Sequence, residues 1–127
     1  MNLFVVGAGS VGTFLAAKLT QVTEVTLIAR DSSVQRFTNG VSLQEEGRDS
    51  KLCKISCLGW NEIREFPSNS SILLATKAFH LKDALREIAK RTAAAKHAGA
   101  TKSSAPGRGD SSAPTLVFCQ NGLGILD

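Results

Sequence analysis

Residues 2–12 read Asn-Leu-Phe-Val-Val-Gly-Ala-Gly-Ser-Val-Gly, and the architecture of the chain follows from this stretch. Asn2 to Val6 is a short apolar run, which is typical of a buried parallel strand. Gly7-Ala8-Gly9-Ser10-Val11-Gly12 fits the pattern G-x-G-x-x-G. The first glycine of this pattern allows a tight turn, the second lets the backbone approach a pyrophosphate, and the third lets a helix pack close to the strand. The segment therefore predicts a turn that holds an anion at a helix amino terminus.

The neighbouring segments supply the strand, turn and helix that this motif requires. A helix is predicted over Ser10 to Gln21, followed by a β-branched strand over Glu24 to Ala29. Four apolar residues of the helix have the spacing of a buried stripe: Val11, Phe14, Leu15 and Leu19. The first 30 residues thus predict a βαβ unit.

The remaining regular segments complete an α/β pattern. Two further buried strands are predicted, Ser71 to Ala75 and Thr115 to Cys119. Two short strands should form an antiparallel hairpin, Val41 to Gln44 and Leu52 to Leu58. Helices are predicted over Asp31 to Phe37, capped by Asp31 or Ser32, and over Leu81 to about Lys96. We therefore expect a Rossmann-like, mostly parallel, doubly wound sheet with a small hairpin excursion.

Length and composition indicate one soluble domain over residues 1–127. A net charge of +4 is too mild to suggest nucleic acid but would suit a small anionic ligand. No apolar run approaches the roughly 18 residues of a membrane span, and no signal peptide is evident, so we expect a cytoplasmic protein. Three cysteines are too few for a disulfide framework or a zinc ribbon, so we expect free thiols and no metal: Cys53, Cys57 and Cys119.

Residues 98–113 contain Ala, Gly, Ser, Thr and Pro with a few charged residues, and no large apolar side chain. Such a segment buries too little apolar surface to offset the entropy of ordering it. We expect residues 98–113 to form a disordered insertion loop.

The second strand is followed by two residues that indicate different dinucleotide cofactors. A basic residue at this point accommodates the 2′-phosphate of NADP, whereas an acid bonds the ribose hydroxyls of NAD. Arg30 occupies the position, and Asp31 follows it. Because Asp31 is also suited to cap the next helix, the sequence favours NADP bound by Arg30.

Polar residues also follow the later strands. Lys77 comes after the strand Ser71 to Ala75, at the sheet edge where ligands of open α/β folds lie, and could reach a ribose or phosphate oxygen. Nearby His80 has no acid or nucleophile spaced to it, so we expect a surface histidine without a catalytic role. Asn121, after the last strand, offers an amide to a nicotinamide ribose or a substrate oxygen, although Asn-Gly alone indicates only a turn.

Four spaced motifs together resemble the ketopantoate reductase (2-dehydropantoate 2-reductase) family. They are the glycine motif, Leu27-Ile-Ala-Arg30, Thr76-Lys77-Ala78-Phe79 and Asn121-Gly122-Leu123-Gly124. The resemblance implies NADP, with Gly7 to Gly12 on the pyrophosphate, Arg30 on the 2′-phosphate, Lys77 on the cofactor and Asn121 near nicotinamide and substrate. It also implies reduction of 2-dehydropantoate, a 2-oxo acid, to pantoate in pantothenate biosynthesis.

In that family the catalytic lysine belongs to a second, helical, carboxy-terminal domain, which these 127 residues lack. We therefore expect a fragment without a catalytic residue of its own, inactive alone, which would form a homo-oligomer or receive the missing domain. Two alternatives stay open: a non-catalytic NADP-binding or regulatory module, and the cofactor domain of another 2-oxo acid or hydroxy acid dehydrogenase.

Overall fold

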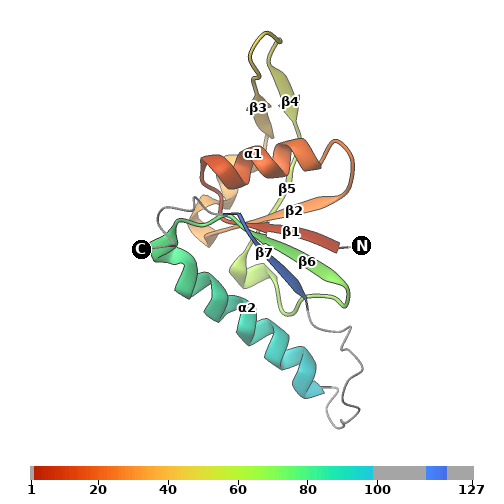
Figure 1. Ribbon diagram of the computed structural model, residues 1–127, viewed down its shortest axis with the longest axis vertical. Helices are drawn as coiled ribbons and strands as arrows, with labels where there is room; N and C mark the ends of the chain where they lie inside the picture. The colour runs from red at the N-terminus through yellow and green to blue at the C-terminus, as the bar shows by residue number, and fades with distance from the viewer. Residues whose placement is uncertain (1, 99–113, 120–127) are drawn as a thin grey trace.

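The computed structural model describes residues 2–98 and 114–119, and its main feature is a five-stranded parallel sheet (Figure 1). The strands lie in the order β5-β2-β1-β6-β7, and every neighbouring pair is parallel. Their bounds are β1 Asn2–Val6, β2 Val25–Ala29, β5 Ser56–Gly59, β6 Ser70–Leu74 and β7 Thr115–Phe118. The predicted Rossmann-like, doubly wound fold is confirmed by this order.

Helices cover both faces of the sheet, with α1 (Ser10–Leu19) on one side and α2 (Ala78–Ala98) on the other (Figure 1). Successive residues of a strand face opposite sides, so β1 contributes to two cores. Val5 packs with Ala16 and Ala17 of α1, whereas Val6 packs with Ala84 and Ile88 of α2. The central strand is therefore buried on both faces.

The face of α1 that packs on the sheet is only partly the predicted one: Leu19 packs against the core, but Val11 and Phe14 do not. Val11 is 53% exposed and Phe14 46% exposed, while the buried residues of α1 are Gly12, Ala16 and Ala17. Small side chains allow the helix to lie close to the sheet, so close approach rather than apolar bulk selects the buried face. On α2 the predicted stripe is confirmed, since Ala84 and Ile88 are buried and Leu81 and Leu85 pack against the same core.

The predicted hairpin is correct only in its first half. β3 (Val41–Leu43) pairs antiparallel with β4 (Lys51–Cys53), and this hairpin projects beyond α1 (Figure 1). The predicted strand Leu52 to Leu58 breaks after Cys53, and its second half becomes β5, parallel to β2. Ile55 between them is buried in the core under α1. Pairing with β5 covers an edge of β2 that would otherwise expose its N–H and C=O groups.

Other differences lie at element ends and at the sheet edge. β7 was expected to be buried but is exposed, with Phe118 at 52%, because only β6 lies beside it among the described strands. Residues 31–37 form the short 3₁₀ helix η1, for which Arg30, rather than Asp31 or Ser32, is the N-cap. α1 ends at Leu19 rather than Gln21, and α2 begins at Ala78 rather than Leu81.

The loop predicted over residues 98–113 lies outside the described residues except for Ala98, the last residue of α2. Over the described residues, no helix is long and apolar enough to cross a membrane. The same part of the chain contains no cluster of His, Cys, Asp and Glu that could hold a metal ion. The three cysteines are free thiols, as expected, and burial raises the pKa of Cys57.

Candidate functional site

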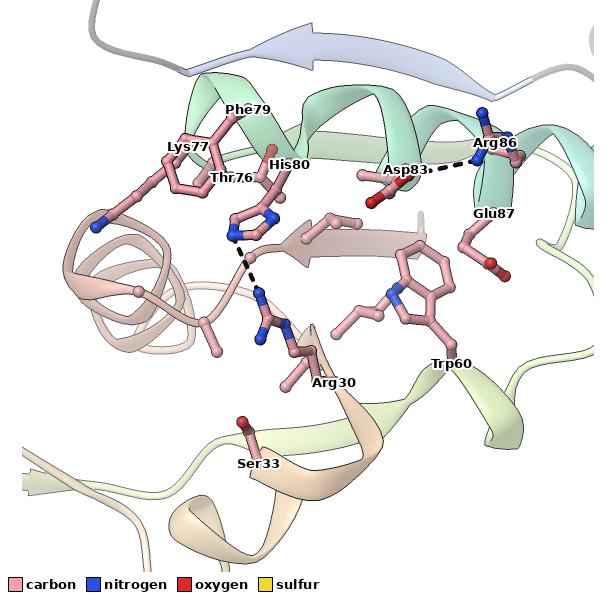
Figure 2. Close-up of a pocket in the computed structure, with 18 of the residues that line it drawn as sticks. Arg30, Ser33, Trp60, Thr76, Lys77, Phe79, His80, Asp83, Arg86 and Glu87 are labelled. Atoms are coloured by element: carbon pink, nitrogen blue, oxygen red, sulfur yellow. Dashed lines mark hydrogen bonds and ion pairs between the residues drawn. The ribbon is translucent and has the colours of Figure 1, made fainter.

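A cavity of about 660 Å³ opens at the carboxyl ends of β1, β2 and β6 (Figure 2). The chain leaves β1 toward β2 on one side and later returns to β6 on the other side, so the strand order reverses here. Ligands of open α/β sheets bind at such a reversal. The cavity is lined from β1 to α1 by Gly7, Ala8 and Gly9, from β2 by Arg30, and after β6 by Thr76 and Lys77.

Two glycines of the turn are required by the fold itself. Gly7 has a φ of +111°, and a Cβ there would lie 2.9 Å from the backbone carbon of Ala75 and the nitrogen of Thr76. A Cβ on Gly12 would overlap the carbonyl oxygen of Gly7. Any larger residue at either position would therefore push α1 or the start of the β6–α2 loop away from β1.

Gly9 is different, because nothing in the described part of the chain requires it to be glycine. Its φ of −79° and ψ of −165° suit any residue, and a Cβ there would meet no atom of the described residues within 4 Å. Gly9 is exposed and lines the cavity. The missing side chain thus leaves open space in the cavity above Gly9, among the residues that the structure describes.

The start of α1 is open to an anion. Gly9 is the N-cap and makes no side-chain capping bond, and no acidic residue lies in the first turn. The first N–H groups of a helix have no partner within the helix and carry partial positive charge. Ser10 and Val11 are exposed there, whereas Gly12 is buried against the sheet. The glycine turn and the helix start thus offer free N–H groups and open space, which an anion could occupy.

Arg30 and Asp31 face different surroundings. The Arg30 side chain is exposed and extends into the cavity (Figure 2). The Asp31 carboxylate instead accepts a hydrogen bond from the backbone N–H of Asn61 at 3.1 Å, at the start of the 3₁₀ helix η2 (Trp60–Glu62). Asp31 therefore does cap a helix, although not the one predicted, and it does not line the cavity.

His80 is a site residue that sequence reasoning missed. It was expected to be a surface residue without a role, yet it is half-buried and lines the cavity. The distance from Arg30 Nη2 to His80 Nε2 is 3.0 Å (Figure 2). No local pattern predicts this contact, because it joins two elements that are 50 residues apart in sequence.

Other lining residues were also missed. Ser33 and Arg36 of η1 lie one and two turns beyond Arg30, a spacing that could have been read from the predicted helix. Trp60 forms a wall of the cavity, and the Arg91 guanidinium lies 4.9 Å from its ring centroid. Arg91 also donates to Glu87 at 2.7 Å, and this hydrogen bond lowers the pKa of Glu87.

Lys77 lines the cavity, as predicted for a residue at the carboxyl end of the sheet, but it lies apart from Arg30. Its exposed side chain extends from the start of α2 in the direction of α1 (Figure 2). Asn121 lies outside the described residues. The structure therefore brings five of the predicted site residues to one cavity, Gly7, Ala8, Gly9, Arg30 and Lys77.

Comparisons with known proteins agree with this architecture. A family model described as "Ketopantoate reductase PanE/ApbA" matches residues 3–127. A 2-dehydropantoate 2-reductase from Mesorhizobium japonicum is 33% identical over 92 residues, which cover 70% of this chain and 27% of that protein. A crystal structure assigned as a ketopantoate reductase from Ralstonia solanacearum MolK2 has a TM-score of 0.62 at 23% identity, over 94% of this chain and 32% of that one. The chain thus spans about a quarter to a third of these relatives.

Proposed function

This chain belongs to the ketopantoate reductase family, a family of oxidoreductases, and we propose that it is the NADPH-binding part of an enzyme that reduces 2-dehydropantoate. The observation that carries the proposal is the cavity in which an open glycine turn and an arginine at the end of β2 lie together. The two features match the two kinds of phosphate in NADPH, the pyrophosphate and the 2′-phosphate.

The glycine turn fits a pyrophosphate. The space above Gly9 lets phosphate oxygens approach the backbone, and the free N–H groups at the start of α1 can donate to them. Backbone N–H groups in this proposal come from Ala8, Ser10 and Val11. Gly7 and Gly12 would contribute by allowing the tight turn between β1 and α1. These six residues form the pyrophosphate site in our proposal.

Arg30 fits the 2′-phosphate. A guanidinium makes charge-assisted, often bidentate hydrogen bonds with phosphate oxygens. Ser33 and Arg36 line the same cavity and would add a hydroxyl and a second positive charge. Asp31 could instead bond the ribose hydroxyls of NAD, but its carboxylate accepts a hydrogen bond from the backbone N–H of Asn61. This arrangement supports NADPH rather than NADH.

The remaining roles follow from family membership. Lys77 would donate to the cofactor, and Asn121 would lie near the nicotinamide and a small 2-oxo acid substrate. When bound, NADPH supplies the hydride for reduction of a ketone. In this proposal the chain's own residues bind and orient the cofactor. The proposal also includes a cytoplasmic location. It further includes assembly with the missing catalytic domain or with other copies of this chain.

Calorimetric titration of the chain with NADPH and NADH tests the proposal. A hydrogen bond to a charged group contributes about 1.5–3 kcal/mol, so NADPH should bind roughly tenfold to over a hundredfold more tightly than NADH. Arg30→Ala should erase most of that difference and leave NADH binding nearly unchanged. Arg48→Ala, which removes an exposed arginine of the β3–β4 turn, is the matched control and should change neither affinity. Equal affinities of the unmutated chain for the two cofactors would refute the assignment.

A further inference from the structure

The contact between Arg30 and His80 joins the two sides of the cavity. Arg30 follows β2, and His80 lies in the first turn of α2, after β6. The backbone N–H of His80 donates to the Lys77 carbonyl at 2.8 Å, and its ring lies 4.2 Å from the Phe79 ring, centroid to centroid. The imidazole thus lies beside the Phe79 ring at the start of α2, and the arginine reaches across to it (Figure 2).

The chemistry of the two groups fixes the direction of this hydrogen bond. A guanidinium can only donate, so Nε2 of His80 is the acceptor in this contact. An imidazole acceptor, unlike a carboxylate, brings no negative charge to the guanidinium. The contact also uses only Nη2 of the guanidinium, and its side chain has no other hydrogen-bond or ion-pair partner among the described residues. The remaining donors are therefore available to a ligand.

Two carboxylates also line the cavity, and each already has a cationic partner. Asp83 and Glu87 follow His80 on α2; Asp83 pairs with Arg86, and Glu87 pairs with Lys90 and Arg91. Arg30 contacts His80 instead, an acceptor that leaves the charge of the guanidinium uncompensated.

We propose that His80 is a positioning residue that sets the preference for NADPH over NADH by holding Arg30 toward the 2′-phosphate; this inference rests on the proposed NADPH site. A long arginine side chain loses considerable rotamer freedom when it binds a ligand. An arginine that is already oriented loses less on binding, which favours the cofactor that carries the phosphate. NADH has no 2′-phosphate, so its affinity does not depend on the contact.

The test is the dissociation constants of NADPH and NADH for variants at position 80. His80→Ala should weaken NADPH binding roughly threefold to tenfold, the range of one net hydrogen bond, and leave NADH unchanged. His80→Gln, whose amide oxygen reaches about as far as Nε2, should restore NADPH affinity. His80→Asn, with a shorter reach, should behave like His80→Ala. A loss shared equally by the two cofactors would show a structural role and overturn the proposal.

A double-mutant cycle separates positioning from direct phosphate binding. In an Arg30→Ala background, His80→Ala should have no further effect on NADPH, because the imidazole acts through the arginine. A further loss there would show that His80 binds the phosphate itself and would overturn the positioning role. Unchanged NADPH affinity of His80→Ala, in a chain whose wild type prefers NADPH, overturns this inference alone. A wild-type chain without that preference overturns the proposed function and this inference with it.

Discussion

Replacing Gly9 by alanine should leave the fold intact and weaken cofactor binding. The backbone at Gly9 is already extended, and within the described ranges the new methyl group would meet no atom closer than 4 Å. A compatible Gly→Ala change stabilises a protein by about 0.4–1 kcal/mol through the unfolded chain. Alanine is a poorer N-cap than glycine by up to about 1 kcal/mol. These effects nearly cancel, so the unfolding free energy should change by less than about 0.5 kcal/mol.

The effect on the cofactor should be much larger. The methyl group would occupy the space through which a pyrophosphate approaches the start of α1. Forcing an extra methyl group into a packed contact costs about 1–3 kcal/mol, which corresponds to a roughly fivefold to 150-fold loss of affinity. Calorimetric titration with NADPH, together with thermal unfolding of the same sample, measures the two quantities separately.

Gly12→Ala is the contrasting variant. Its Cβ would overlap the carbonyl oxygen of Gly7, so α1 must move away from β1 and stability should fall with affinity. A Gly9→Ala chain that unfolds like wild type and binds NADPH with unchanged affinity would refute the placement of the pyrophosphate at this turn.

Two further predictions concern stability. Glu87→Gln should lower the unfolding free energy by about 0.5 kcal/mol at pH 7, because the Arg91 hydrogen bond holds the pKa of Glu87 below its usual value. A depressed folded-state pKa stabilises the protein above the unfolded-state value, and this stabilisation is lost as pH falls through the folded-state pKa. The difference from wild type in urea unfolding should therefore shrink steadily below about pH 4. Asp83→Asn, which breaks an exposed pair with Arg86, should cost less. Replacing Gly99 to Ser112 by a Gly-Ser linker of equal length should leave the thermal unfolding temperature and the NADPH affinity unchanged. The reason is that this sequence is predicted to bury no apolar side chains in the core. A large loss of stability would show that the segment packs against the rest of the protein.

The parts of the fold that could be predicted are those encoded by local pattern. The apolar run before the glycines, the glycine spacing and the stripe on α2 each specify an element without reference to distant residues. The buried face of α1 could not be found from apolar bulk, because Gly12 and Ala16 are buried for their small size while Val11 and Phe14 face outward. The break between β4 and β5 was missed because it depends on the free edge of β2, which is a tertiary requirement.

The candidate site divides in the same way. Arg30 and Lys77 could be assigned because residues that follow parallel strands meet at one edge of the sheet. His80 and Trp60 could not, because they reach the cavity through contacts across the fold. His80 meets Arg30 from the other side of the cavity, and Trp60 is fixed by Arg91, which donates to its carbonyl at 2.7 Å.

The adjacent residues Arg30 and Asp31 both bear on the cofactor preference that we propose. The sequence offers both a base and an acid at the end of β2, and either could face a ribose. Asp31 can occupy this position because residue 59 is glycine. A Cβ on Gly59 would overlap the Asp31 carboxylate oxygen that accepts the hydrogen bond from the backbone N–H of Asn61. With Asp31 bound to η2, Arg30 remains at the end of β2 and extends into the cavity. The cofactor preference that we propose therefore depends on a carboxylate that lies outside the cavity as much as on the arginine within it.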